Sequence, residues 1–324
     1  MVAQLFQNWL ADPGAQRRMR QAAGGFAAQW NCGATHRRFD EAMASLPEQS
    51  VDAVVEAIRT LFADDIWVDS LIEGLADQLR ADPFFDPPFR AINSDIHNGL
   101  IVFEDERVSI AAGVVTVTQL AGKKSAKRGA TSVGFSGRVS VIKFAKAGGA
   151  RIGFWEAPRI TAGFSAAQAG RCRHTGSRDI ADGDILVIDG RHQSYVIEHA
   201  SANLVMLQAE INLDQAPLGV EYDSASRTYV GCSANGDGAS RIQMITTLLR
   251  KLDRAGAFEA VADFRDHPDF FVRWHVMKEL LGIDAAAALP HLKHMAARDP
   301  HPEARRAARQ VLDRLEAPKS RRAA

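Results

Sequence analysis

Residues 182–197 read DGDILVIDGRHQSYVI and contain two short apolar runs separated by a polar turn. The first run begins at Ile185 after a Gly-Asp turn at Gly183, and the second resumes at Tyr195. Apolar runs of this length, bounded by Gly, Asp and polar residues, are typical of β-strands joined by tight turns. The stretch therefore predicts two neighbouring strands.

The same strand pattern extends outward over about residues 96–232. Gly, Asn or Asp clusters separate most of the short apolar or alternating runs, which lie at 100–103, 108–114, 139–143, 151–156 and 204–207. We find no helical pattern between these runs. Many short strands with turn signals and no helices between them favour an antiparallel β sandwich or barrel.

Helical spacing of apolar residues flanks this β region on both sides. Ser50 is placed to cap a helix whose apolar stripe is formed by Val51, Val54, Val55, Ile58, Leu61 and Phe62. A proline-rich segment at 83–89 marks a boundary, and helical spacing returns after about residue 238.

The C-terminal helical region contains a loose internal repeat. Asp266-His267-Pro268-Asp269 recurs as Asp299-Pro300-His301-Pro302-Glu303, with the two His-Pro pairs 34 residues apart and arginine after each. Helix pairs with a period of roughly 30 to 45 residues indicate an α-solenoid. The segment resembles HEAT repeats, and the resemblance implies a helical surface for a protein or peptide partner.

The 182–197 stretch resembles the second half of a cupin, and the preceding segment at 143–150 is similar to a cupin hairpin. The nearest match is the sensory cupin of AraC-type regulators. That resemblance implies a barrel that holds a small ligand without metal. Metal-binding cupins present His-x-His followed by Glu, whereas the region shortly before Gly183, residues 170–176, contains a single histidine, His174. Ser194 stands where the family places its last metal ligand, so no metal ligand is carried over from the family.

These patterns together predict an α+β multidomain chain. We expect an N-terminal helical region over 1–90, a cupin-like antiparallel β-barrel over 91–236, HEAT-like α-hairpins over 237–318 and a frayed tail over 319–324.

Polar residues around the 182–197 stretch form the candidate ligand site. Its proposed members are Arg171, Arg173, Arg191, His192, Ser194 and Tyr195. Guanidinium groups bind carboxylate or phosphate through paired hydrogen bonds, so these residues favour an anionic ligand. The competing interpretation pairs the arginines with neighbouring carboxylates as surface ion pairs, since aspartates stand at 179, 182, 184 and 189.

Three histidines provide an alternative metal site. His174, His192 and His199 would bind Fe(II) if neighbouring strands turned them into one cavity, because imidazole is a good ligand for iron. Nearby arginines would repel a cation, so we expect no metal and no cofactor, with Fe(II) as the alternative.

Composition excludes several classes of partner. Hydrophobic residues make up 46% of the 324 residues and charged residues 24%, as in an ordinary globular chain. Lys and Arg together number 39 and so do Asp and Glu, which disfavours nucleic-acid binding through bulk charge. No apolar run is long enough to cross a membrane.

The N-terminus does not look like a secretion signal, and the three cysteines form no pairs by spacing. We therefore expect a cytoplasmic protein.

The preferred functional hypothesis is a cytosolic binding or scaffold protein. Its barrel would hold a small ligand, an anionic one if the arginines contribute, and its HEAT-like helices would bind a protein or peptide partner or a second copy of the chain. The alternative hypothesis is a non-haem iron oxygenase of cupin type that acts on a small molecule or peptide.

Overall fold

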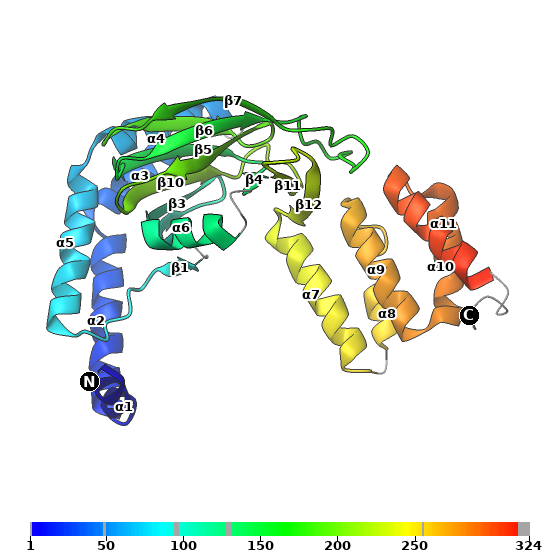
Figure 1. Cartoon of the computed structure of the whole chain (residues 1–324). Helices are drawn as coiled ribbons and strands as arrows, with labels where there is room; N and C mark the ends of the chain where they lie inside the picture. Colours follow the sequence, from blue (N-terminus) through cyan, green and yellow to red (C-terminus); the bar gives the residue numbers. More distant parts are fainter. Residues whose placement is uncertain (1, 48–49, 94–96, 127–130, 255, 317–324) are drawn as a thin grey trace.

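The computed structural model describes residues 2–47, 50–93, 97–126, 131–254 and 256–316. Figure 1 shows helices at the N-terminal end, a β domain in the middle and a second group of helices at the C-terminal end. The predicted frayed tail at 319–324 lies outside these residues.

Five helices precede the β domain. They are α1 (Val2–Leu10), α2 (Pro13–Asn31), α3 (Ala34–Ala44), α4 (Val51–Ala63) and α5 (Ile66–Ala81). Asp12 begins α2 by accepting hydrogen bonds from two backbone N–H groups of its first turn, with Pro13 at the first helical position. Ser50 begins α4 in the predicted way, because its hydroxyl accepts from Ala53 N–H.

The β domain consists of antiparallel strands. The first six are β1 (Arg90–Asn93), β2 (His97–Glu104), β3 (Val108–Val115), β4 (Ser132–Phe135), β5 (Val139–Lys146) and β6 (Arg151–Glu156). The last six are β7 (Arg173–Asp179), β8 (Ile185–Asp189), β9 (Gln193–His199), β10 (Leu204–Ile211), β11 (Leu218–Asp223) and β12 (Tyr229–Ala234).

The strands form a six-stranded sheet and two three-stranded sheets within the described residues. Their strand orders are β1-β2-β3-β10-β5-β8, β12-β11-β4 and β7-β6-β9. The predicted antiparallel β region between two helical regions is confirmed. A closed barrel stays a prediction.

The two faces of the six-stranded sheet pack against different parts of the molecule. On β10, Leu207, Ala209 and Ile211 join a core that includes the apolar stripe of α4. The opposite face of the sheet contributes Ile142 and Met206, among others, to a second core that also receives side chains from β6 and β9. Because side chains alternate along a strand, β3, β5, β8 and β10 each supply both cores.

One element contradicts the sequence analysis. Residues 117–126 form helix α6 (Val117–Ala126) between β3 and β4, where we expected no helix within the β region. Leu120 is buried in the core between the sheets, and its N–H donates to Thr116 O in the first turn. Among residues 117–121, the part of the helix whose side chains the structure describes, only Leu120 is buried, and a single buried position gives no clear helical period.

The C-terminal helices are α7 (Asp237–Lys251), α8 (Ala257–Ala262), α9 (Phe270–Ile283), α10 (Ala285–Arg298) and α11 (Pro302–Glu316). They share a core of their own, to which α7, α8, α9, α10 and α11 all contribute. Figure 1 shows them beyond the β4-β11-β12 sheet, with α7 following directly from β12.

Repeated hydrogen bonds underlie the internal sequence repeat. His267 Nδ1 accepts from the N–H two residues ahead, and His301 Nδ1 does the same, which preserves the 34-residue spacing. Arg273 donates to the carbonyls six and five residues before it, and Arg305 does likewise. These arginines are 32 residues apart, so two spacings coexist in one repeat.

Candidate functional site

The three arginines of the predicted ligand site engage neighbouring groups of the β domain. Arg173 is exposed and pairs with Glu156 on β6 at 2.6 Å. Arg191 is mostly buried and pairs with Asp189 at 2.7 Å and also with Asp214. Arg171 is exposed and forms a β-bridge with Thr228. The structure therefore favours the ion-pair interpretation for Arg173 and Arg191.

The remaining predicted residues lie on or beside β9 and face different ways. His192 Nδ1 lies 3.4 Å from an Asp189 oxygen. Ser194 is buried, and its hydroxyl donates to Gly134 O on β4. Tyr195 faces the core between the sheets, where burial, together with the nearby Glu210, raises the pKa of its phenol. Of the six predicted residues, only Tyr195 packs against this core.

The structure does not bring the three histidines of the alternative metal site together. His192 precedes β9 and His199 ends it, so the seven residues of extended chain place them roughly 20 Å apart. His174 on β7 lies 3.1 Å from Ser177 Oγ and 3.3 Å from Glu198. One metal ion cannot bind His192 and His199 at that separation.

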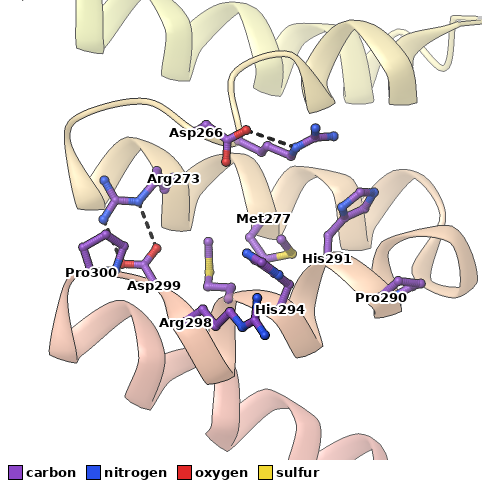
Figure 2. A pocket seen from close by; sticks show the side chains of 11 residues that line it. Asp266, Arg273, Met277, Pro290, His291, His294, Arg298, Asp299 and Pro300 are labelled. Atoms are coloured by element: carbon purple, nitrogen blue, oxygen red, sulfur yellow. Dashed lines mark hydrogen bonds and ion pairs between the residues drawn. The ribbon is translucent and has the colours of Figure 1, made fainter.

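A groove lies in the C-terminal helical region (Figure 2). It has a volume of about 470 Å³. Side chains from the segment between α8 and α9, from α9, from α10 and from the turn after α10 line it. They are Arg265, Asp266, Arg273, Met277, Pro290, His291, His294, Met295, Arg298, Asp299 and Pro300.

The floor of the groove is apolar, with a buried ion pair beside it. Met277 and Met295 are buried, on α9 and α10 respectively. Beside them Arg273 donates to both oxygens of Asp299, at 2.8 and 2.9 Å, as Figure 2 shows in part. Burial alone would raise the pKa of Asp299, but the hydrogen bonds from Arg273 and from His301 N–H outweigh it and lower the pKa. This ionised pair fixes the turn after α10 against α9.

The rim of the groove is cationic. Arg298 is exposed, and its guanidinium forms no ion pair with any residue that the structure describes. Arg265 reaches only the exposed Asp266, at 3.3 Å. His291 and His294 lie on the same side of α10 and both line the groove (Figure 2). The rim therefore offers one guanidinium and two imidazoles to a ligand.

A second hollow of about 580 Å³ adjoins the groove at the junction with the β domain. The two share Asp266, Arg273 and Pro300 as lining residues. The β domain contributes the 162–163 segment to this second hollow. The junction itself is held by Ala166 N–H, which donates to Glu303 at 2.7 Å, and by the His301 ring, which stacks on Phe270 at 3.5 Å. The two hollows therefore lie next to each other, with Asp266, Arg273 and Pro300 between them.

The sequence pattern pointed to residues that border this groove, but it did not predict a binding site there. It noted the His-Pro repeat and Arg273, yet gave no role to Arg298. The position of Arg298 in the sequence could have indicated a role for it, because Arg298 is the last residue of α10 and immediately precedes the Asp299-Pro300 turn of the repeat. Sequence alone does not show that this side chain lacks a carboxylate partner.

Comparison with known proteins supports the helical assignment. A family model of HEAT repeats matches residues 232–313, which confirms the predicted HEAT-like segment. No curated protein matches the chain. Within the described residues, no helix has both the length and the apolar character that a membrane span requires.

Several solved structures show a weak likeness to the chain. Ectoine synthase from P. lautus has 12% identity and a TM-score of 0.24, over 38% of this chain and 69% of that one. A cupin domain from Bordetella pertussis Tohama I has 12% identity and a TM-score of 0.23, over 37% and 97%.

Oxalate decarboxylase from Lactobacillus farciminis has 12% identity and a TM-score of 0.26, over 49% of this chain and 38% of that one. The match thus spans well under half of the decarboxylase. Likenesses this weak carry no argument about activity, and the AraC-type resemblance stays a prediction. The fold and the family model together define an α+β chain in which a HEAT-repeat region follows an antiparallel β domain.

Proposed function

We propose that the chain is a binding protein whose HEAT-repeat region holds an acidic segment of a partner protein in the groove of Figure 2. The observation that carries the proposal is the exposed Arg298 guanidinium, which has no ion-pair partner among the described residues and lies beside His291 and His294. A carboxylate on the partner would form paired hydrogen bonds with that guanidinium.

The shape of the groove suits an extended segment. The buried Met277 and Met295 provide an adaptable apolar floor for the partner's alkyl side chains. The second hollow lies next to the groove and is lined by the 162–163 segment of the β domain. A segment with acidic residues beside apolar ones would therefore place carboxylates on the rim and alkyl groups on the floor.

The β domain has a second role in this proposal, the binding of a small ligand between its sheets. Two arginines that were predicted to bind an anionic ligand instead form ion pairs within the chain. Arg173 pairs with Glu156, and Arg191 pairs with Asp189 and Asp214. The iron oxygenase alternative would need His192 and His199 at one metal, and β9 separates them. Binding is thus the function that the site geometry supports best.

Fluorescence anisotropy tests the proposal with a short fluorescein-labelled peptide of alternating glutamate and leucine. We expect the full chain to bind it, and Arg298→Glu to weaken binding at least about tenfold because a like charge replaces the attraction. Lys293→Glu is the matched control, since Lys293 is exposed on the same helix but does not line the groove.

Two outcomes would contradict the proposal. One is equal affinity for a peptide with lysine in place of glutamate. The other is an equal loss of binding in the Arg298 and Lys293 variants, which would indicate attraction to the net charge of the helix rather than to the groove.

A further inference from the structure

A pocket lies between the N-terminal helices, away from the groove described above. It is lined by residues of α2, of the start of α3 and of α5. Figure 1 shows α2 and α5 alongside each other at the N-terminal end of the molecule. The pocket has a volume of about 430 Å³, within the range of roughly 300–1,000 Å³ that is typical of small-molecule sites.

Two aromatic rings of α2 line the pocket and are held in place by contacts outside it. Trp30 Nε1 donates to Val102 O on β2 at 3.0 Å, and the Trp30 ring meets Phe89 edge to face. Phe26 makes edge-to-face contacts with Phe85 and Phe89. Both lining rings are only partly buried, and no residue of α2 is fully buried although the helix packs against the core. A ligand in the pocket therefore meets accessible ring surface that is already in position.

Helix α5 contributes a glycine from its middle to the lining of the pocket. Glycine destabilises a helix interior relative to alanine, so its presence at this position requires a reason. A Cβ atom at Gly74 would lie 3.2 Å from Phe26 Cε2, closer than ordinary van der Waals contact. Gly74 therefore lets the Phe26 ring lie against the backbone of α5, and the missing side chain leaves room in the pocket.

Four neutral polar side chains in the pocket form no hydrogen bond with any residue that the structure describes. They are Gln29, Thr35, Ser70 and Gln78. Asp77 is the one carboxylate among the described lining residues, and it pairs with Arg80 at 2.5 Å. These lining residues include no lysine, arginine or histidine. The pocket thus offers hydrogen bonds mainly from neutral groups.

We propose that this pocket binds a neutral saccharide. Its hydroxyl groups bond to the unpartnered amide and hydroxyl side chains, and the C–H face of a sugar ring packs against Trp30 and Phe26. The inference is independent of the groove between the C-terminal helices and of the β domain.

The class of ligand follows from the chemistry of the lining. Each sugar hydroxyl donates one hydrogen bond and accepts others, and a glutamine side chain has both donors and an acceptor, so neighbouring hydroxyls match Gln29 and Gln78. The C–H groups of a sugar ring suit the negative face of an aromatic ring. An anion would meet no cationic lining residue, and a cation would compete with Arg80 for Asp77. A hydrocarbon would leave the amides without partners.

Nuclear magnetic resonance of the full chain, with the indole nitrogens of its five tryptophans labelled, tests the inference. The probes are the methyl glycosides of glucose, galactose and mannose, and Trp30→Phe identifies the Trp30 signal. We expect at least one glycoside to shift that signal with a dissociation constant of about 1–10 mM, as is usual for so small a ligand. The methyl glycoside of glucuronate and N-acetyl-trialanine amide, the anionic and peptide probes, should bind more weakly.

Two variants and one control locate the effect. Gln29→Ala on α2 and Gln78→Ala on α5 should each weaken binding of the glycoside about threefold to tenfold, the loss of one hydrogen bond. Gln21→Ala is the matched control, since Gln21 is exposed on α2 and does not line the pocket. It should leave the affinity unchanged. Circular dichroism of each variant confirms that it is folded.

Three outcomes would overturn the inference. The first is no shift of the Trp30 signal by any of the three glycosides at about 100 mM. The second is tighter binding of the anionic or the peptide probe than of every neutral glycoside. The third is an affinity that survives both Gln29→Ala and Gln78→Ala, or that falls equally in Gln21→Ala. None of these outcomes bears on the experiment with the glutamate-leucine peptide.

Discussion

At the scale of single residues, a buried ion pair and a buried lysine with a largely exposed partner hold separate parts of the molecule together. Arg273 and Asp299 join α9 to the turn after α10, with both side chains almost fully buried. Lys143 on β5 is only 3% exposed, donates to Phe62 O at 2.6 Å and pairs with Asp65 beyond α4. The first pair fixes the turn after α10 to α9, the second fixes the end of α4 to β5, and each is testable by removal of one partner.

Replacement of Arg273 by alanine leaves the Asp299 carboxylate buried without its counter-charge. We expect the unfolding free energy of the helical region to fall by about 3–5 kcal/mol, as when other buried pairs are broken. Urea unfolding followed by circular dichroism measures the change. Arg306→Ala, an exposed position on α11, is the control and should change stability by no more than about 0.5 kcal/mol.

The same pair makes the helical region sensitive to acid. Folding lowers the pKa of Asp299 below its ordinary value of 3.8. The stabilisation is therefore complete above about pH 4 and is lost as the pH falls through the lowered pKa. The melting temperature of the wild type should drop over this acidic range, and Asp299→Asn should melt lower at neutral pH and show a flatter acid profile. An unchanged profile in the variant would contradict the assignment.

Lys143→Ala should destabilise the chain by about 2–3 kcal/mol, because it leaves the Phe62 carbonyl without its donor and opens space beneath α4. Lys146→Ala is a matched control on the same strand, since Lys146 is exposed and pairs with Asp182 at 3.1 Å. An exposed pair contributes at most about 1 kcal/mol. Thermal unfolding of the two variants should separate them clearly.

At the scale of elements, the N-terminal helices act as a cover for one face of the six-stranded sheet. Val139 and Val141 on β5 and Leu207 on β10 pack in the same core as Phe39, Phe62 and Trp67 from those helices. A sheet face this apolar is not stable in water without a covering layer.

Deletion of residues 1–81 should therefore cause aggregation, because the apolar face of β5 and β10 would be exposed to solvent. Light scattering of the purified fragment measures this outcome. A monomeric, well-folded fragment would show that the β domain does not depend on the helices.

The sequence predicted elements best where one periodicity dominated. The α4 stripe and the Ser50 cap were predicted correctly, and strands do lie on either side of the 189–192 turn. These two strands belong to different sheets, however, because β8 pairs with β5 and β9 pairs with β6. Helix α6 was missed because only Leu120 among its described positions is fully buried. The internal repeat was recognised, yet its arginines follow a spacing of 32 residues that only the hydrogen bonds reveal.

At the scale of the whole molecule, the residues left available to bind a ligand depend on which charged side chains pair with one another. The sequence does not specify these ion pairs. Arginines at 173 and 191 looked available for a ligand, but carboxylates from Glu156 and Asp214 occupy them. Arg298 looked unremarkable, but the fold leaves its guanidinium at the rim of a groove. Which charge remains without a partner is a property of tertiary structure, because the pairs join residues distant in sequence.

Hydrogen–deuterium exchange of the full chain, with and without the glutamate-leucine peptide, tests the central claim most directly. The account predicts slower exchange in residues 263–300 and in the 162–163 segment, and no such change in Arg298→Glu. Protection confined to the N-terminal helices or to the β sheets, or none at saturating peptide, would contradict the claim that the HEAT-repeat groove is the site of binding.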